Sequence, residues 1–128
     1  MELYNVLNRG VEKRPLFLDT MDHARFLHDL YEFNNEKSAG NAYRLSSTKT
    51  GPMMDLRDPS LGPAQLVDIH GWVLMRNHYH LLLSERIEKG LSKFLMKVNV
   101  GYAKYFNEKY KRSGYLFQGR TKKVLIER

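Results

Sequence analysis

Short apolar segments bounded by turn-forming residues occur at four places along the chain and predict four β-strands. Segments rich in Leu, Val, Ile and aromatic residues and closed by Gly, Asn or Ser are typical of strands. They span residues 2–8, 65–75, 78–84 and 115–126. The first is followed by the turn Asn8-Arg9-Gly10, and Arg76-Asn77 forms a tight connection between the second and the third.

Two longer segments repeat their apolar residues every three or four positions and predict α-helices. The spacing holds over residues 21–35 and 88–112, and it gives each helix one wide apolar face. Asp19 or Thr20 is a suitable cap for the first helix, because a side-chain oxygen there accepts from the unpaired amides of the first turn. Gly114 is placed to end the second helix in a left-handed conformation.

The order of these elements, β-α-β-β-α-β, predicts an α+β fold of the ferredoxin-like split type. In that fold an antiparallel four-stranded sheet carries two helices on one face. A chain of 128 residues suits one domain, 1–128, with one hydrophobic core. Residues 38–64 hold three of the four prolines and lack sustained periodicity, which predicts a long mobile loop. Trp72 lies in an apolar strand and is expected in the core.

Composition restricts both the chemistry and the compartment. The chain has no cysteine, which excludes disulfides, thiolate zinc sites and cysteine nucleophiles. A chain without disulfides suits a reducing cytoplasm, and no apolar run approaches the ~20 residues of a membrane span. The net charge of +7 favours an anionic partner, of which nucleic acid is the commonest.

The excess of positive charge lies in the second half of the chain. Residues 1–64 carry a net charge of −1, whereas residues 65–128 carry +8. Between Lys104 and Lys123, basic residues are mixed with tyrosines and phenylalanines. Such a mixture suits a groove that follows a nucleic-acid backbone and offers rings for stacking. A solvated helix face followed by an amphipathic strand has the same composition, so charge alone leaves both interpretations open.

Two histidines, His78 and His80, stand two residues apart on the third predicted strand. Because side chains alternate along a strand, both imidazoles leave the same face, about 6–7 Å apart at Cβ, while Tyr79 points the other way. Two neutral imidazoles on one rigid strand form a ready pair of ligands for a divalent metal ion. Two histidines packed between a helix and the sheet would show the same spacing, so this alternative stays open.

Longer segments around these histidines resemble a known protein family. The stretch GWVLMRNHYHLLLS, the helical LSKFLMKVNVGYAKYFNEKYKRSG and the following YLFQGRTKK are similar to the REP-associated tyrosine transposases, relatives of the single-tyrosine HUH transposases. The opening YNVLNRGVEKRPLFLDTMDHARFLHDL is similar to that family's first strand, Asn-Arg-Gly turn and first helix. The resemblance covers nearly the whole chain except residues 38–64.

The resemblance implies a ferredoxin-like nuclease core that acts on single-stranded or hairpin DNA. His78 and His80 would then hold Mg²⁺ or Mn²⁺ against the scissile phosphate, and a tyrosine would attack the phosphorus to form a 5′-phosphotyrosine. The family carries this tyrosine on a further helix, which the resemblance places beyond Arg128. Tyr102 and Tyr105, on the second predicted helix, are weak candidates within the chain, because their positions suit core packing.

Basic residues of the turns, the long helix and the last strand are the candidate DNA contacts. Arg76 stands where the family commonly has proline and adds a cation beside the histidines, whereas Thr121 stands where an aromatic residue is usual. The full candidate set is Arg9, Arg76, Lys97, Lys104, Lys111, Arg112, Arg120, Lys122 and Lys123.

Two functions of different classes follow from these residues. The first is a DNA transposase of the HUH single-tyrosine class, which cleaves and rejoins single-stranded or hairpin DNA with the help of Mg²⁺ or Mn²⁺. The alternative is a non-catalytic module that holds single-stranded or hairpin nucleic acid on the same sheet. The sequence leaves open whether the protein forms a homodimer. It also leaves open whether the chain is a shortened member of the family or a descendant that binds DNA without catalysis. No membrane partner is expected.

Overall fold

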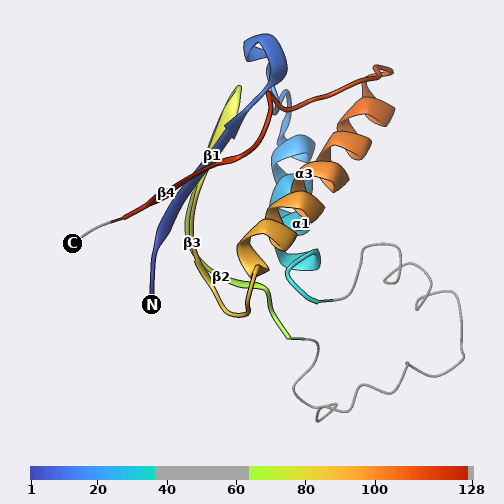
Figure 1. Ribbon diagram of the computed structural model, residues 1–128. Coiled ribbons are helices and arrows are strands. Elements are labelled where there is room, and N and C mark those ends of the chain that lie inside the picture. Colours follow the sequence, from blue (N-terminus) through green and yellow to red (C-terminus); the bar gives the residue numbers. More distant parts are fainter. Residues whose placement is uncertain (37–63, 127–128) are drawn as a thin grey trace, which may run out of the picture.

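The residues that the structure describes form a four-stranded sheet with two helices on one of its faces (Figure 1). The computed structural model describes residues 1–36 and 64–126. The predicted loop at 38–64 lies, apart from Ala64, outside these described residues. The elements in chain order are β1 (Tyr4–Arg9), the short 3-10 turn η1 (Val11–Lys13), α1 (Thr20–Glu32), β2 (Val67–Met75), β3 (His78–Glu85), α3 (Gly90–Lys109) and β4 (Lys122–Leu125).

The strands lie in the order β2-β3-β1-β4, and every neighbouring pair is antiparallel. This order confirms the predicted α+β fold of the split β-α-β-β-α-β type, with α1 and α3 together on one side of the sheet (Figure 1). Pairing of β1 with β3 sets Arg9 opposite His78 and Leu7 opposite His80. Residues directly opposite each other share a face, so this register decides which side chains surround the histidines.

The core lies between the sheet and the two helices. On β3, Tyr79, Leu81 and Leu83 are buried, in the alternation that a half-covered sheet requires. From the helices, Phe26 of α1 and Tyr102 of α3 meet edge to face, with ring centroids 5.3 Å apart. Each fully buried side chain of this size stabilises the fold by about 1.5–3 kcal/mol relative to exposure. The helical face of the sheet is therefore well fixed.

Side chains and one unusual backbone position define the helix ends. Asp19 caps α1 by accepting a hydrogen bond from the Asp22 amide at 2.9 Å, as predicted. The predicted end of the helix at residue 112 was wrong, because α3 stops at Lys109. Gly114 does have the predicted positive φ angle, but Lys111, nearer the helix end, has one too. The Arg112 amide then donates back to the Asn107 carbonyl, which closes the helix without glycine.

The last predicted strand and the tryptophan also differ from expectation. Only Lys122–Leu125 forms β4, whereas residues 115–121 run as an irregular segment. A β-bridge between Gly10 and Phe117 joins this segment to the end of β1. Trp72 is 54% exposed, because β2 is an edge strand and its outer side chains extend past the helices. Apolar sequence in an edge strand therefore does not imply burial.

Candidate nucleic-acid interface

His78 and His80 project together from the face of the sheet that α1 and α3 leave uncovered, which we call the open face. Their ring centroids are 5.2 Å apart and the rings are nearly perpendicular. Both side chains are half-buried, whereas Tyr79 between them is fully buried on the helical side. The prediction that both imidazoles project from the same face of the strand is confirmed. The alternative, in which both histidines pack between a helix and the sheet, is wrong, because no helix covers this face in the described residues.

The register surrounds the histidines with a mixture of charge and apolar surface. Across β1, Arg9 lies opposite His78, and Lys122 of β4 lies opposite Leu7 on the far side. Across β2, Met75 lies opposite His78 and Val73 opposite His80. These side chains share the open face of the sheet. Cations and aliphatic groups intermixed on one surface suit a partner with both phosphates and bases.

The hydrogen bond of His78 determines which ring nitrogen is available. Its Nδ1 lies 2.8 Å from the Asn77 side-chain oxygen, which can only accept, so Nδ1 carries the proton. The Nε2 lone pair of His78 is then free for a ligand, an arrangement typical of metal-binding histidines. Among the residues that the structure describes, no third His, Asp or Glu joins the pair. The two imidazoles therefore fit part of a coordination shell for Mg²⁺ or Mn²⁺, and further ligands have to come from elsewhere.

A buried polar network fixes β3 from behind. The Tyr79 hydroxyl donates to the Asn99 side-chain oxygen at 2.6 Å, and Asn99 donates to Thr121 Oγ1 at 2.7 Å. Asn8 donates to the same Thr121 oxygen at 3.2 Å, and its own oxygen accepts from the Arg9 amide. Burial raises the pKa of Tyr79, so this hydroxyl stays protonated and bound. The network joins β1, β3, α3 and the segment before β4 directly beneath the histidines.

The two tyrosines considered as nucleophiles lie on the opposite side of the sheet from His78 and His80. Tyr102 is fully buried, donates to the Leu16 carbonyl, and has its pKa raised by burial. Tyr105 donates to Asp22 at 2.7 Å. A hydroxyl that attacks a phosphate has to reach it directly, and the sheet stands between these tyrosines and the histidines.

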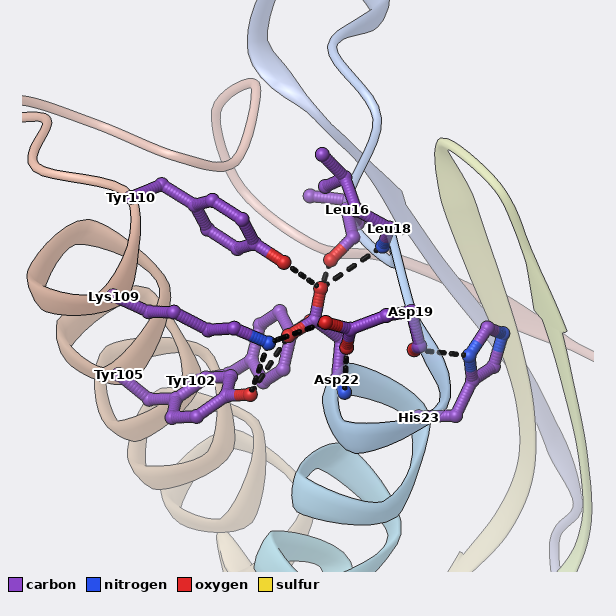
Figure 2. Close-up of polar contacts among 9 residues, drawn as sticks. All are labelled: Leu16, Leu18, Asp19, Asp22, His23, Tyr102, Tyr105, Lys109 and Tyr110. Atoms are coloured by element: carbon purple, nitrogen blue, oxygen red, sulfur yellow. Dashed lines mark hydrogen bonds and ion pairs between the residues drawn. The ribbon is translucent and has the colours of Figure 1, made fainter.

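Asp22 is the centre of a second polar cluster, between the start of α1 and the end of α3 (Figure 2). Its buried carboxylate accepts from Lys109 at 2.8 Å, from Tyr105 at 2.7 Å and from Tyr110 at 2.6 Å. The Leu18 amide also donates to it at 2.9 Å. Burial would raise the pKa of Asp22, but these hydrogen bonds outweigh burial and hold it well below its usual range.

The segment that this cluster holds reaches the turn before His78. The amides of Leu16 and Phe17 both donate to the Arg76 carbonyl, at 2.7 and 3.2 Å. The Gly10 amide donates to the Asn77 carbonyl at 2.9 Å. The β2–β3 turn is thus anchored at two successive residues, which fixes the start of β3. Sequence reasoning missed both polar networks, because their members are far apart in the chain.

The predicted DNA-contacting cations fall on different surfaces. Arg9 and Lys122 lie on the open face, and Arg76 lies in the turn beside it. Lys111, Arg112 and Arg120 belong to the segment between α3 and β4, and this segment passes the end of the sheet at which that turn lies (Figure 1). Lys123 instead points to the helical side, where it donates to Ser92 at 2.8 Å.

Two further members of the predicted set, Lys97 and Lys104, line a groove between α1 and α3. Phe33 and Gly101 also line this groove, which has a volume of about 720 Å³ and lies on the helical layer, away from the open face. Lys97 already donates to the Asn35 carbonyl at 2.8 Å. DNA contact by either lysine stays a prediction, and their position separates them from the histidine surface.

Comparisons with known proteins bear on the fold. No protein-family model and no curated protein matches the sequence. Among solved structures, the chain is similar to a REP-associated tyrosine transposase that was solved bound to a REP hairpin. The TM-score is 0.51 at 9% sequence identity, and the match covers 99% of this chain and 57% of that one. At this identity the likeness shows a shared fold, and this chain spans little more than half the length of its neighbour.

No helix in residues 1–36 or 64–126 is both long and apolar enough to cross a membrane. The longest, α3, carries lysines along its whole length.

Proposed function

We propose that this protein binds single-stranded or hairpin DNA on the open face of its sheet and presents a backbone phosphate to His78 and His80. We propose further that the pair belongs to a DNA strand-transfer site of the HUH single-tyrosine class. The observation that carries the proposal is the joint projection of both imidazoles from the open face, with Arg9 beside them. The resemblance of the sequence and the likeness of the fold support the same function.

Each group on the open face has a role that its chemistry suits. The guanidinium of Arg9 attracts the phosphate and can bind two of its oxygens. Val73, Met75 and Leu7 offer apolar surface to sugars and unstacked bases. A divalent cation held by His78 and His80 would withdraw charge from the phosphoryl oxygens and so favour attack at phosphorus. Asn77 keeps the His78 ring oriented through its Nδ1.

A non-catalytic DNA-binding module is the second candidate, and two observations favour it. The described residues supply two metal-ligating side chains at this place and no third. Tyr79, Tyr102 and Tyr105 are all on the helical side of the sheet. Strand transfer therefore needs a nucleophile other than these three tyrosines, whereas binding needs none.

Titration of Mn²⁺ into the protein, followed by fluorescence anisotropy with a labelled single strand, tests the proposal. We expect Mn²⁺ to bind and to strengthen DNA binding, because a cation held by His78 and His80 would attract a backbone phosphate. The double variant H78A/H80A should lose Mn²⁺ binding, measured by isothermal titration calorimetry. Its affinity for the labelled DNA should no longer increase when Mn²⁺ is added. His28, which is exposed on α1, provides the matched control H28A. Equal Mn²⁺ binding by H78A/H80A and wild type would contradict the metal site, and absence of DNA binding by wild type would refute the function.

A further inference from the structure

The outer edge of β2 is a surface that the proposed DNA site leaves unused. In residues 1–36 and 64–126, β2 pairs with β3 alone, which makes it an edge strand of the sheet. At the start of this edge, the Asn34 side chain donates to the Val67 carbonyl at 2.9 Å and accepts from the Val67 amide at 3.0 Å. At its end, two amides of the segment before α1 donate to the Arg76 carbonyl. Between these two points, the described residues provide no further strand to pair with the edge.

The register shows which backbone groups point outward from this edge. In an antiparallel pair, residues that bond to the partner strand alternate with residues whose N–H and C=O groups point away from it. Val67, opposite Glu85, is of the second kind, because its peptide groups bond outward. Leu81, opposite Trp72, is an even number of positions from Glu85 along β3, so Trp72 is of the second kind too, as is Leu74. The edge thus offers the peptide groups of Trp72 and Leu74 to another strand.

An apolar pocket lies beside this edge. It has a volume of about 560 Å³, and side chains of β2 and of the second half of α1 line it, among them Leu27 and Val67. Trp72 and Tyr31 contribute rings to its lining that are 54% and 82% exposed. A strand added to β2 would place every second side chain on the helical side, over this pocket. Unpaired backbone groups beside an apolar pocket suit the addition of an extended peptide segment.

β2 lacks most of the features that protect an edge strand from pairing. Proteins commonly protect such strands by making them short or by placing lysine or proline in them. The other edge strand, β4, has four residues, of which two are lysines. In contrast, β2 has nine residues, VDIHGWVLM, with no lysine, arginine or proline. A β-bulge between Ile69 and Gly71 interrupts its first half, whereas residues 72–75 are regular and apolar. This part of the edge is therefore suited to pairing.

The charge around this edge indicates the kind of partner. Residues 27–36 and 64–75 contain four acidic residues and no lysine or arginine, in a chain of net charge +7. The two aspartates among them form ion pairs with arginines. The two glutamates, Glu32 and Glu36, are exposed. Negative charge repels nucleic acid and attracts a basic partner, so this side of the molecule suits a basic protein segment.

We propose that the edge of β2 binds an extended segment of a partner protein that has a net positive charge and apolar side chains at alternate positions. The segment adds a strand to the sheet by pairing with Trp72 and Leu74, and its apolar side chains enter the pocket beside α1. Its positive charge complements Glu32 and Glu36. This site is separate from the DNA site of the proposed function, so either can fail without the other.

A fluorescein-labelled peptide of sequence KKVTVTVTV tests the inference by fluorescence anisotropy. We expect the protein to bind it and the emission of Trp72, the single tryptophan of the chain, to shift to the blue as the ring leaves water. The acidic peptide EEVTVTVTV should bind at least about tenfold more weakly. Two further forms of the basic peptide are N-methylated at every valine or at every threonine. Because alternate N–H groups of a strand point to opposite edges, one of these forms should lose binding and the other should keep it.

The variant W72K should bind the basic peptide about tenfold more weakly or less, because it removes apolar surface and puts a charge on the edge. The matched control is V124K, since Val124 is 52% exposed on the other edge strand and should bind as wild type does. Circular dichroism verifies that the variants fold, and Y31K supplies the test if W72K does not.

Absence of peptide binding by wild type, equal binding by W72K, or equal binding of the two N-methylated forms would overturn the inference. A wild-type dimer in sedimentation that W72K dissociates would also overturn it, because the edge would then pair with a second copy of the chain. None of these outcomes affects DNA binding by the open face, which the labelled single strand measures separately.

Discussion

At the scale of single residues, side chains of β3 that alternate between the two faces of the sheet place candidate metal ligands and a core residue within three positions. His78 and His80 point to the open face, and Tyr79 between them points into the core, where it meets Phe26 and donates to Asn99. A shift of one residue would exchange these faces, burying the imidazoles and exposing the phenol. Tyr79 is therefore a positioning residue for the histidines, because its burial and its hydrogen bond fix the register of the strand.

Replacement of Tyr79 by phenylalanine tests this role. The change keeps the ring and removes the hydroxyl, so the buried Asn99 oxygen loses its donor at 2.6 Å. We expect the free energy of unfolding in urea to fall by about 1–3 kcal/mol, the cost of leaving a buried polar atom unpaired. The control is Y115F, because Tyr115 is exposed and its hydroxyl has no such partner. Equal stability of Y79F and wild type would show that the network does not hold β3.

The same three positions show what the sequence could predict. The two-residue alternation of side chains along a strand predicted the directions of His78, Tyr79 and His80 correctly, since the local pattern alone determines them. The partner of Tyr79 could not be predicted, because Asn99 is 20 residues away and Thr121 is farther still. Asn and Thr are common on any surface, and their meeting beneath the histidines depends on how α3 packs against the sheet.

At the scale of elements, Asp22 ties the start of α1 to the end of α3. Lys109, Tyr105 and Tyr110 all come from the last turns of α3 or directly after it, and all three donate to one carboxylate (Figure 2). The adjacent segment anchors the β2–β3 turn through the Arg76 carbonyl. The cap at Asp19 was predictable because it is local, whereas the role of Asp22 was not, since its three side-chain donors are more than 80 residues away.

Replacement of Asp22 by asparagine should destabilise the protein strongly. Lys109 would keep Asp19 as a carboxylate partner, but Tyr105 and Tyr110 would donate to a neutral amide in place of a buried carboxylate. A hydrogen bond to a charged group is worth about 1.5–3 kcal/mol, which sets the size of the expected loss. The matched control is D68N, because the Asp68–Arg86 ion pair is exposed on both sides and is worth less than about 1 kcal/mol. Urea unfolding at neutral pH measures both variants. A D22N variant no less stable than D68N would show that the cluster is not an anchor.

The lowered pKa of Asp22 also fixes how this stability depends on pH. Because the folded-state pKa lies below the unfolded value, the unfolded chain takes up the proton first as pH falls. The contribution of Asp22 is fully present above about pH 4, the usual aspartate pKa, and is lost as pH falls toward the lowered value. We expect the stability difference between wild type and D22N to shrink as pH is lowered from about 6 to about 3. A difference that grows over this range would contradict the assigned direction of the pKa.

At the scale of the whole molecule, the distribution of charge decides which surfaces suit the proposed DNA partner. The sequence already placed the positive excess in residues 65–128, because charge can be counted without a structure. It did not show which cations share a surface: Lys104 lines the groove between α1 and α3, whereas Lys111 lies beyond the end of α3.

Binding of single-stranded DNA should fall steeply with salt. Each neutralised phosphate releases counterions, and contributes about 0.7 to the log–log slope for a single strand. With Arg9, Arg76 and Lys122 on or beside the open face, we expect a slope of about 2 or steeper, measured by fluorescence anisotropy between low and physiological salt. An affinity that does not change over this range would exclude phosphate contact as the basis of binding.

The last prediction separates binding from chemistry. A covalent DNA adduct requires a tyrosine hydroxyl that reaches a phosphate bound at the histidines. The hydroxyls of Tyr79, Tyr102 and Tyr105 cannot reach it, because they are hydrogen-bonded on the helical side of the sheet. We expect residues 1–128 to bind a single strand in the presence of Mn²⁺ and to give no DNA-shifted band on a denaturing gel. Anisotropy on the same sample verifies that the DNA is bound. A Mn²⁺-dependent band that Y115F abolishes would instead identify the exposed Tyr115 as a nucleophile and make the chain a strand transferase on its own.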